Sequence, residues 1–144
     1  MSLYSEKLKY LKKEIATIIS KKSKKLNTNQ KIMYKFIQGQ TNKAVFQINE
    51  HTIELHKGDE KKGFRHILEG HYKPNDLEAI DILNIADVFK RGIKLHEEGV
   101  SNKGLDVYMS TKQQKEHRLV LKKVSDGSWI VTFYRKSQKM EARR

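Results

Sequence analysis

The chain has 144 residues, of which 30 are Lys or Arg and 17 are Asp or Glu, giving a formal net charge of +13. Apolar residues make up 37%, enough to bury the core of one domain (residues 1–144), and no stretch approaches the roughly 18 apolar residues of a membrane span. The absence of cysteine excludes disulfides, Cys-type zinc sites and thiol catalysis. We therefore expect a cytoplasmic protein without an integral membrane segment.

The positive charge produces a field that attracts polyanions. Nucleic acid is the first candidate partner, and an anionic membrane surface is the second. A soluble protein that simply has a lysine-rich surface would show the same composition.

Residues 5–25 are predicted to form an amphipathic, lysine-rich helix, because Leu8, Leu11, Ile15 and Ile18 follow helical spacing. Lysines occupy its other faces and its C-terminal end, where they suit the helix dipole. The helix either binds phosphates or a membrane surface, or it packs on the core with its lysines in solvent.

Three short strands are predicted next, over residues 31–37, 43–49 and 52–56, because branched and aromatic residues dominate them. Tight joints between them imply an antiparallel meander. A helix is then expected over residues 64–71, with Gly70 as its C-terminal cap. Asn75 and Glu78 resemble a capping box that opens a helix ending near Arg91, and Asp81 or Asn84 could cap a second segment within it.

The last part of the chain is predicted to contain a loop over residues 95–103 and three strands over residues 104–110, 117–124 and 129–136. Asp126-Gly127 is a hairpin turn signal between the last two, and the tail over residues 137–144 is expected to fray. The predicted fold is α+β: a small antiparallel sheet of meanders, packed with N-terminal and central helices around a core in residues 31–136.

Alternation along the last three strands predicts one apolar face and one polar face. The residues expected to pack under the helices are Leu105, Val107, Met109, Leu119, Leu121, Trp129, Val131 and Phe133. The opposite face would carry Asp106, Tyr108, Ser110, Arg118, Lys122, Thr132 and Tyr134. That polar face is either a floor for a phosphate-containing ligand, with Tyr108 or Tyr134 stacking a base, or an ordinary solvated surface.

Two histidines, His66 and His71, stand five residues apart between Gly63 and the next helix. On a continuous helix this spacing rotates them about 140° from each other, which argues against a shared metal ion. We expect neither a metal nor a cofactor. Imidazoles titrate near neutrality, so histidines can transfer protons in RNA cleavage, where the 2′-hydroxyl is the nucleophile. Alternatively, His66 is a surface residue and His71 a cap or a buried, hydrogen-bonded ring.

A resemblance sharpens this expectation. Gly63-Phe64-Arg65-His66-Ile67, followed after three residues by His71, is similar to the GFxHIxxxH-like segment of the barnase–EndoU–colicin–RelE superfamily, in its phage- and toxin-associated branches. The helix from Asp81 to Gly92 and the closing strands up to Arg135 resemble the elements that follow that segment. The resemblance covers residues 43–136.

The resemblance implies a small α+β fold and a metal-independent ribonuclease of toxin or phage type. It implies catalytic roles for His66, His71, Thr132 and Tyr134, and we expect Arg65, Tyr108, Arg118, Lys122 and Arg135 to bind the nucleic acid. RNA is the expected partner, with DNA as the alternative, and an immunity or antitoxin protein is a further expected partner. A basic nucleic-acid-binding protein of phage or mobile-element origin that does not cleave, or an interaction module, would fit the same charge.

Overall fold

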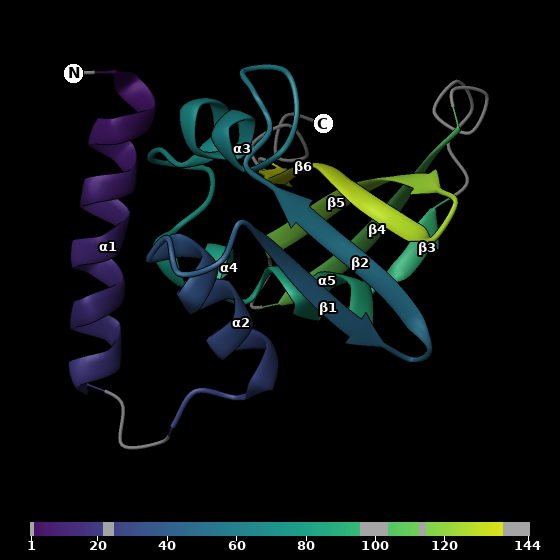
Figure 1. Ribbon diagram of the computed structural model, residues 1–144, viewed down its shortest axis with the longest axis horizontal. Coiled ribbons are helices and arrows are strands. Elements are labelled where there is room, and N and C mark those ends of the chain that lie inside the picture. Colours follow the sequence, from purple (N-terminus) through teal and green to yellow (C-terminus); the bar gives the residue numbers. More distant parts are fainter. Residues whose placement is uncertain (1, 22–24, 96–103, 113–114, 137–144) are drawn as a thin grey trace, which may run out of the picture.

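The computed structural model describes residues 2–21, 25–95, 104–112 and 115–136. The helices are α1 (Leu3–Lys21), α2 (Thr28–Ile37), α3 (Phe64–His71), α4 (Ala79–Leu83) and α5 (Ile85–Arg91). The strands are β1 (Lys43–Ile48), β2 (His51–His56), β3 (Ile93–Leu95), β4 (Leu105–Lys112), β5 (Lys115–Val124) and β6 (Gly127–Lys136). The predicted α+β class is confirmed. Figure 1 shows α1 standing at one side, with α2, α3 and α4 between it and the sheet.

Helix α1 covers Leu3–Lys21, whereas the apolar spacing predicts a helix over residues 5–25. Residues 22–24 lie outside the described residues, and Lys25 is not helical. Leu11 and Ile15 are fully buried, while most of its lysines stay at the surface. It packs on α3 and α4. The hydroxyl of Tyr72 donates a hydrogen bond to the Glu14 carboxylate, which ties the middle of α1 to the segment after α3. This contact suits a tyrosine whose ring is buried and whose hydroxyl needs a partner.

The predicted strand over residues 31–37 is wrong, because this segment is helix α2. Its start is fixed by a capping box: the Asn27 side chain accepts a hydrogen bond from the Gln30 backbone N–H at 2.8 Å, and the Gln30 side chain accepts one from Asn27 at 2.9 Å. Met33, Phe36 and Ile37 are buried at helical spacing. The two satisfied N–H groups and the 3.6-residue period outweigh the β-propensity of a short apolar run.

Strands β1 and β2 form a two-stranded antiparallel hairpin, which replaces the predicted three-stranded meander. Asn49 and Glu50 both have positive φ, as a type I′ turn requires. The sheet order is β1-β2-β6-β5-β4-β3, so β2 lies beside the last strand. This β2–β6 pair is parallel and short, with Ile53 opposite Ser128 and Glu54 opposite Trp129.

Helix α3 forms over residues 64–71 as predicted, but Gly70 does not cap it, since the helix runs to His71. The next helix begins at Ala79, later than the Asn75–Glu78 signal suggested, because Asn75 has a φ of 66° and forms part of a turn. Two short helices, α4 and α5, then follow each other. Asn84 lies at the junction between them, whereas Asp81, the other predicted cap of the second segment, lies inside α4.

A bulge in the β5–β6 ladder changes which side chains of β6 are buried. Val120 lies opposite Thr132, whereas Leu121 lies opposite Ile130, so Val131 is the extra residue. As a result Ile130 is buried, and Trp129, predicted to face the helices, is 43% exposed. The predicted turn between these strands is present at Ser125 and Asp126.

The register also inverts the expectation for β4. Directly opposed residues share a face of the sheet. Tyr108 lies opposite the buried Leu119, and Met109 lies opposite Arg118. We call the face with Arg118, Lys122, Thr132 and Tyr134 the outer face, and the face with Tyr108, Leu119, Phe133 and Arg135 the helix face. Residues 137–144 and most of the predicted loop at 95–103 lie outside the described residues.

Candidate active site

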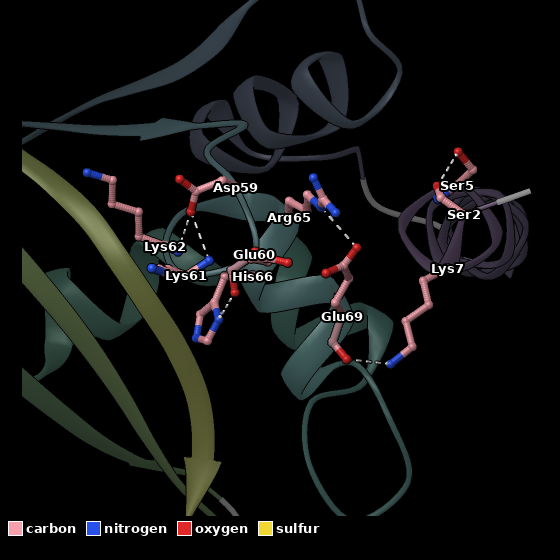
Figure 2. Close-up of polar contacts among 10 residues, drawn as sticks. All are labelled: Ser2, Ser5, Lys7, Asp59, Glu60, Lys61, Lys62, Arg65, His66 and Glu69. Atoms are coloured by element: carbon pink, nitrogen blue, oxygen red, sulfur yellow. Dashed lines mark hydrogen bonds and ion pairs between the residues drawn. The ribbon is translucent and has the colours of Figure 1, made fainter.

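The site begins with the loop between β2 and α3, which two glycines shape. Gly58 and Gly63 have φ of 67° and 87°, and a Cβ on either would meet backbone atoms at 2.9 Å or less. The Asp59 carboxylate accepts hydrogen bonds from the backbone N–H groups of Lys61 and Lys62, at 2.8 and 3.1 Å. These bonds lower the pKa of Asp59 below its ordinary value. The loop is therefore held in one shape (Figure 2).

This loop orients the ring of His66. The Nδ1 atom of His66 lies 3.0 Å from the backbone carbonyl oxygen of Glu60. A carbonyl oxygen can only accept, so the proton of the ring sits on Nδ1 and Nε2 is left without one in the neutral form. Figure 2 shows the His66 ring turned towards β6.

A second fixed imidazole follows at the end of α3. His71 Nδ1 lies 3.0 Å from Oδ2 of Asp76, while Oδ1 of Asp76 accepts a hydrogen bond from the backbone N–H of Arg135 at 3.0 Å. Asp76 is 9% exposed. The His71 ring also stacks on Tyr134, with centroids 5.4 Å apart and planes 29° apart. One buried carboxylate thus joins α3 to β6 and fixes His71.

The two histidine rings meet, although the helical spacing argued that they would diverge. Their centroids are 5.4 Å apart, with the rings edge to face. His71 is the last residue of α3, where the chain leaves helical geometry, and Gly70 has no side chain beside His66. We call His66, His71, Asp76 and Tyr134 the histidine cluster.

The cluster lies where β2 has separated from β6. Beyond its short pairing with β2, β6 accepts a hydrogen bond at the Val131 carbonyl from Gly63 N–H, at 2.8 Å, and its Arg135 N–H is bound by Asp76. Helix α3 therefore occupies the edge of β6 in place of a further strand. This edge position lets helix residues reach Tyr134 on the outer face.

Three further predicted site residues, Thr132, Arg118 and Lys122, lie on the outer face. Thr132 is near the cluster on the outer face, and its buried hydroxyl has no hydrogen-bond partner among the described residues. Arg118, opposite Tyr134, contacts Glu116 at 2.7 Å, and Lys122 is exposed on the same face. The four predicted catalytic residues and two of the predicted binding residues are therefore on one surface: His66, His71, Thr132, Tyr134, Arg118 and Lys122.

Three predicted binding residues are elsewhere. Tyr108 packs against Phe89 on the helix face, with ring centroids 4.6 Å apart, so the prediction that it shares a surface with Arg118 is wrong. The Arg135 side chain also belongs to the helix face, 3.8 Å from Glu78. Arg65 forms an ion pair with Glu69 at 3.0 Å, and Figure 2 shows both turned towards α1.

Sequence reasoning missed two groups that fix the histidines. Asp76 lies within the predicted helix start between Asn75 and Glu78, and its position between Pro74 and a helix gives no sign of a contact with His71. The Glu60 carbonyl carries no side-chain signal at all. Among the described residues, no three His, Asp or Glu side chains converge in a way that could hold a metal ion.

The cluster can therefore accept and donate protons at the Nε2 atoms of two neighbouring rings. No protein-family model and no curated protein matches the sequence. In the part of the chain that the structure describes, no helix is long and apolar enough to cross a membrane.

Proposed function

We propose that this protein is a metal-independent endoribonuclease of the phage or toxin type. The observation that carries the proposal is the pair of rings of His66 and His71, 5.4 Å apart, each with Nδ1 bound to an acceptor. That arrangement leaves both Nε2 atoms for a substrate. It agrees with the resemblance of the histidine segment to the barnase–EndoU–colicin–RelE superfamily.

The reaction needs a base beside the 2′-hydroxyl and an acid beside the 5′-oxygen of one phosphodiester. In the proposed step, His66 Nε2 accepts the proton of the 2′-hydroxyl as its oxygen bonds to phosphorus. The bond from phosphorus to the 5′-oxygen breaks, and that oxygen takes a proton from His71 Nε2. The products are a 2′,3′-cyclic phosphate and a 5′-hydroxyl. The base role falls to His66 because its partner is a neutral carbonyl, whereas protonated His71 forms an ion pair with Asp76.

Other residues of the outer face complete the proposed site. Tyr134 holds the ring of His71 by stacking, and Thr132 carries a hydroxyl that donates to no group among the described residues. Arg118 and Lys122 supply positive charge along the same face, where charge on the transferring phosphoryl group would be stabilised. Asp76 is a positioning residue, since it acts through His71.

RNA is the proposed substrate, because DNA lacks the 2′-hydroxyl that the step consumes. The net charge of +13 supports attraction to a polyanion. An immunity or antitoxin protein and a cytoplasmic location, in a host cell if the chain is phage-encoded, belong to the same proposal through the family resemblance.

The test is cleavage of generic single-stranded RNA in the presence of EDTA. We expect products with 2′,3′-cyclic phosphate ends, and a rate at least about 100-fold lower for His66→Ala or His71→Ala, because general acid/base catalysis contributes about that much or more. His51→Ala is the matched control, since His51 is an exposed histidine on β2 that contacts Phe89. It should cleave at the wild-type rate.

RNA that stays intact after prolonged incubation with a high enzyme concentration would reject the ribonuclease. The second candidate, a nucleic-acid-binding protein that does not cleave, is favoured by the charge alone. Salt-sensitive RNA binding without cleavage would identify it.

A further inference from the structure

Trp129 is the single tryptophan of the chain, and the bulge at Val131 turns it outward. Its side chain is 43% exposed, although a large apolar ring at a strand position opposite Lys122 would ordinarily be covered. It lies on the outer face with Thr132 and Tyr134.

A cavity of about 190 Å³ opens beside this ring. Its walls include His56, Lys62, Gly63, Lys122 and Trp129. The His56 ring lies against Trp129, with centroids 4.4 Å apart. His56 is itself fixed by Glu54 at 2.9 Å, so the aromatic wall is built before any ligand arrives.

We propose that this cavity binds one base of single-stranded RNA, next to the nucleotide that the histidine cluster cleaves. This inference rests on the proposed ribonuclease for its substrate, and it adds a subsite that the catalytic step does not require.

The chemistry of the walls identifies the ligand class. An aromatic ring offers a stacking surface to a base, and two exposed lysines beside it offer charge to the phosphates on either side. The same lysines oppose a cationic ligand, which would otherwise suit a tryptophan face. The volume is below the roughly 300 Å³ at which pockets begin to hold drug-sized ligands, so it suits one ring rather than a whole nucleotide cofactor.

The subsite lies within reach of the same strand of RNA. Trp129 and Tyr134 are separated by five positions on β6, one of which the bulge absorbs. The remaining four steps of about 3.3 Å place the two residues about 13 Å apart on one face. A single strand that passes over Thr132 can therefore contact both.

The test uses the fluorescence of Trp129, which reports on this one position. In the His66→Ala variant, which keeps the RNA intact, an unstructured oligouridylate of about eight nucleotides should quench the emission saturably. Adding Trp129→Leu should weaken binding, followed by anisotropy of labelled RNA, by about tenfold or more, whereas Trp129→Phe should retain most of the affinity. Tyr10→Leu, at an aromatic residue of α1 that is 59% exposed, is the matched control and should change nothing.

Three results would overturn the base site: equal affinity of the Trp129→Leu variant, equal quenching by inorganic polyphosphate, or equal quenching by duplex RNA, whose bases are already stacked. The proposed ribonuclease is tested separately by the wild-type protein. Loss of affinity with Trp129→Leu in a protein that does not cleave would keep the base site and reject the nuclease. RNA cleavage by the wild-type protein, together with unchanged RNA affinity of the Trp129→Leu variant, would keep the nuclease and reject the base site.

Discussion

At the scale of single residues, Thr132 stands out because its hydroxyl is buried without a partner among the described residues. Burying a hydroxyl without a hydrogen bond costs about 1–3 kcal/mol by protein mutational data. Such a cost persists in functional sites, where a group unsatisfied in the free protein is used with a ligand.

Thr132→Val replaces this hydroxyl with a methyl group. We expect the free energy of unfolding to rise by about 1 kcal/mol, because no hydrogen bond is lost. Cleavage should nevertheless slow by about tenfold or more if the hydroxyl donates to the phosphoryl group. Denaturant unfolding and the RNA assay measure the two effects.

Thr132→Ser is the control, because it keeps the hydroxyl and removes only the methyl group. It should cleave faster than the valine variant. A valine variant that is both less stable and fully active would show that the hydroxyl has a structural partner and no part in cleavage.

The sequence pointed to His66 and His71 through the proton-transfer chemistry of imidazole, and the family resemblance added Thr132 and Tyr134. The partners of the histidines were hidden for a physical reason. Asp76 and the Glu60 carbonyl act through contacts made after the chain turns back on β6, and neither a backbone oxygen nor a lone aspartate has a distinctive spacing.

At the scale of elements, α4 depends on Asp81. Its carboxylate accepts a hydrogen bond from the Glu78 N–H at 2.8 Å, and it lies 3.0 Å from His117 Nε2 on β5. Burial by itself raises the pKa of Asp81, but His117, the Glu78 N–H and Arg135 outweigh it and bring the pKa below the ordinary 3.8.

A carboxyl group whose pKa is lower in the folded protein than in the unfolded chain stabilises the fold above its unfolded pKa, and this contribution is lost as the pH falls through the folded pKa. Asp81→Asn should therefore lower the free energy of unfolding at pH 7, by roughly 1–3 kcal/mol for a buried partner left unpaired. The loss should shrink as the pH falls below about 4. Denaturant unfolding at a series of pH values measures it.

Glu78→Gln is the matched control, because the Glu78 side chain is 60% exposed and its contacts with Lys115 and Arg135 are 3.4 and 3.8 Å long. It should change stability by less than about 1 kcal/mol. A difference between Asp81→Asn and wild type that stays constant from pH 7 to pH 2 would contradict the assigned shift.

The elements that the sequence predicted well have either a long run of periodic apolar residues or clear turn residues at both ends. The helix of α1 has several turns of apolar spacing, and the strands of the final sheet are bounded by clear turns. The strand prediction for residues 31–37 was wrong because a run of seven mostly apolar residues fits both the two-residue period of a strand and the 3.6-residue period of a helix. The capping box that marks the helix lies before this run. The prediction that Trp129 faces the helices was wrong because one extra residue in β6 reverses the alternation of side chains. No residue type in the sequence identifies the position of such a bulge.

At the scale of the whole molecule, the excess of positive charge predicts salt-sensitive binding of RNA. Contacts with three to five phosphates of a single strand would give a slope of log K against log salt of about −2 to −4. Replacing Lys62 and Lys122 with Gln should reduce the magnitude of that slope by about 1.4, since each lost contact contributes about 0.7. Anisotropy of labelled RNA at several salt concentrations measures it.

The double variant Lys9→Gln and Lys13→Gln removes the same charge from exposed positions on α1. It should leave the slope unchanged, because the proposed RNA contacts lie on the outer face and not on α1. If this variant reduced the slope as much as the Lys62 and Lys122 variant does, the phosphate contacts would lie on α1. Binding that does not depend on salt would reject nucleic acid as the ligand.

The short parallel pairing of β2 with β6 has a consequence for the order in which this protein matures. It joins residues 53–54 to residues 128–129, so the contact closes late and slowly compared with the hairpins. During synthesis His66 and His71 emerge well before Tyr134 and the Arg135 N–H that orients Asp76. If the protein is the proposed ribonuclease, the chain on the ribosome carries both histidines before the site is complete, and RNA cleavage should begin only once β6 has emerged.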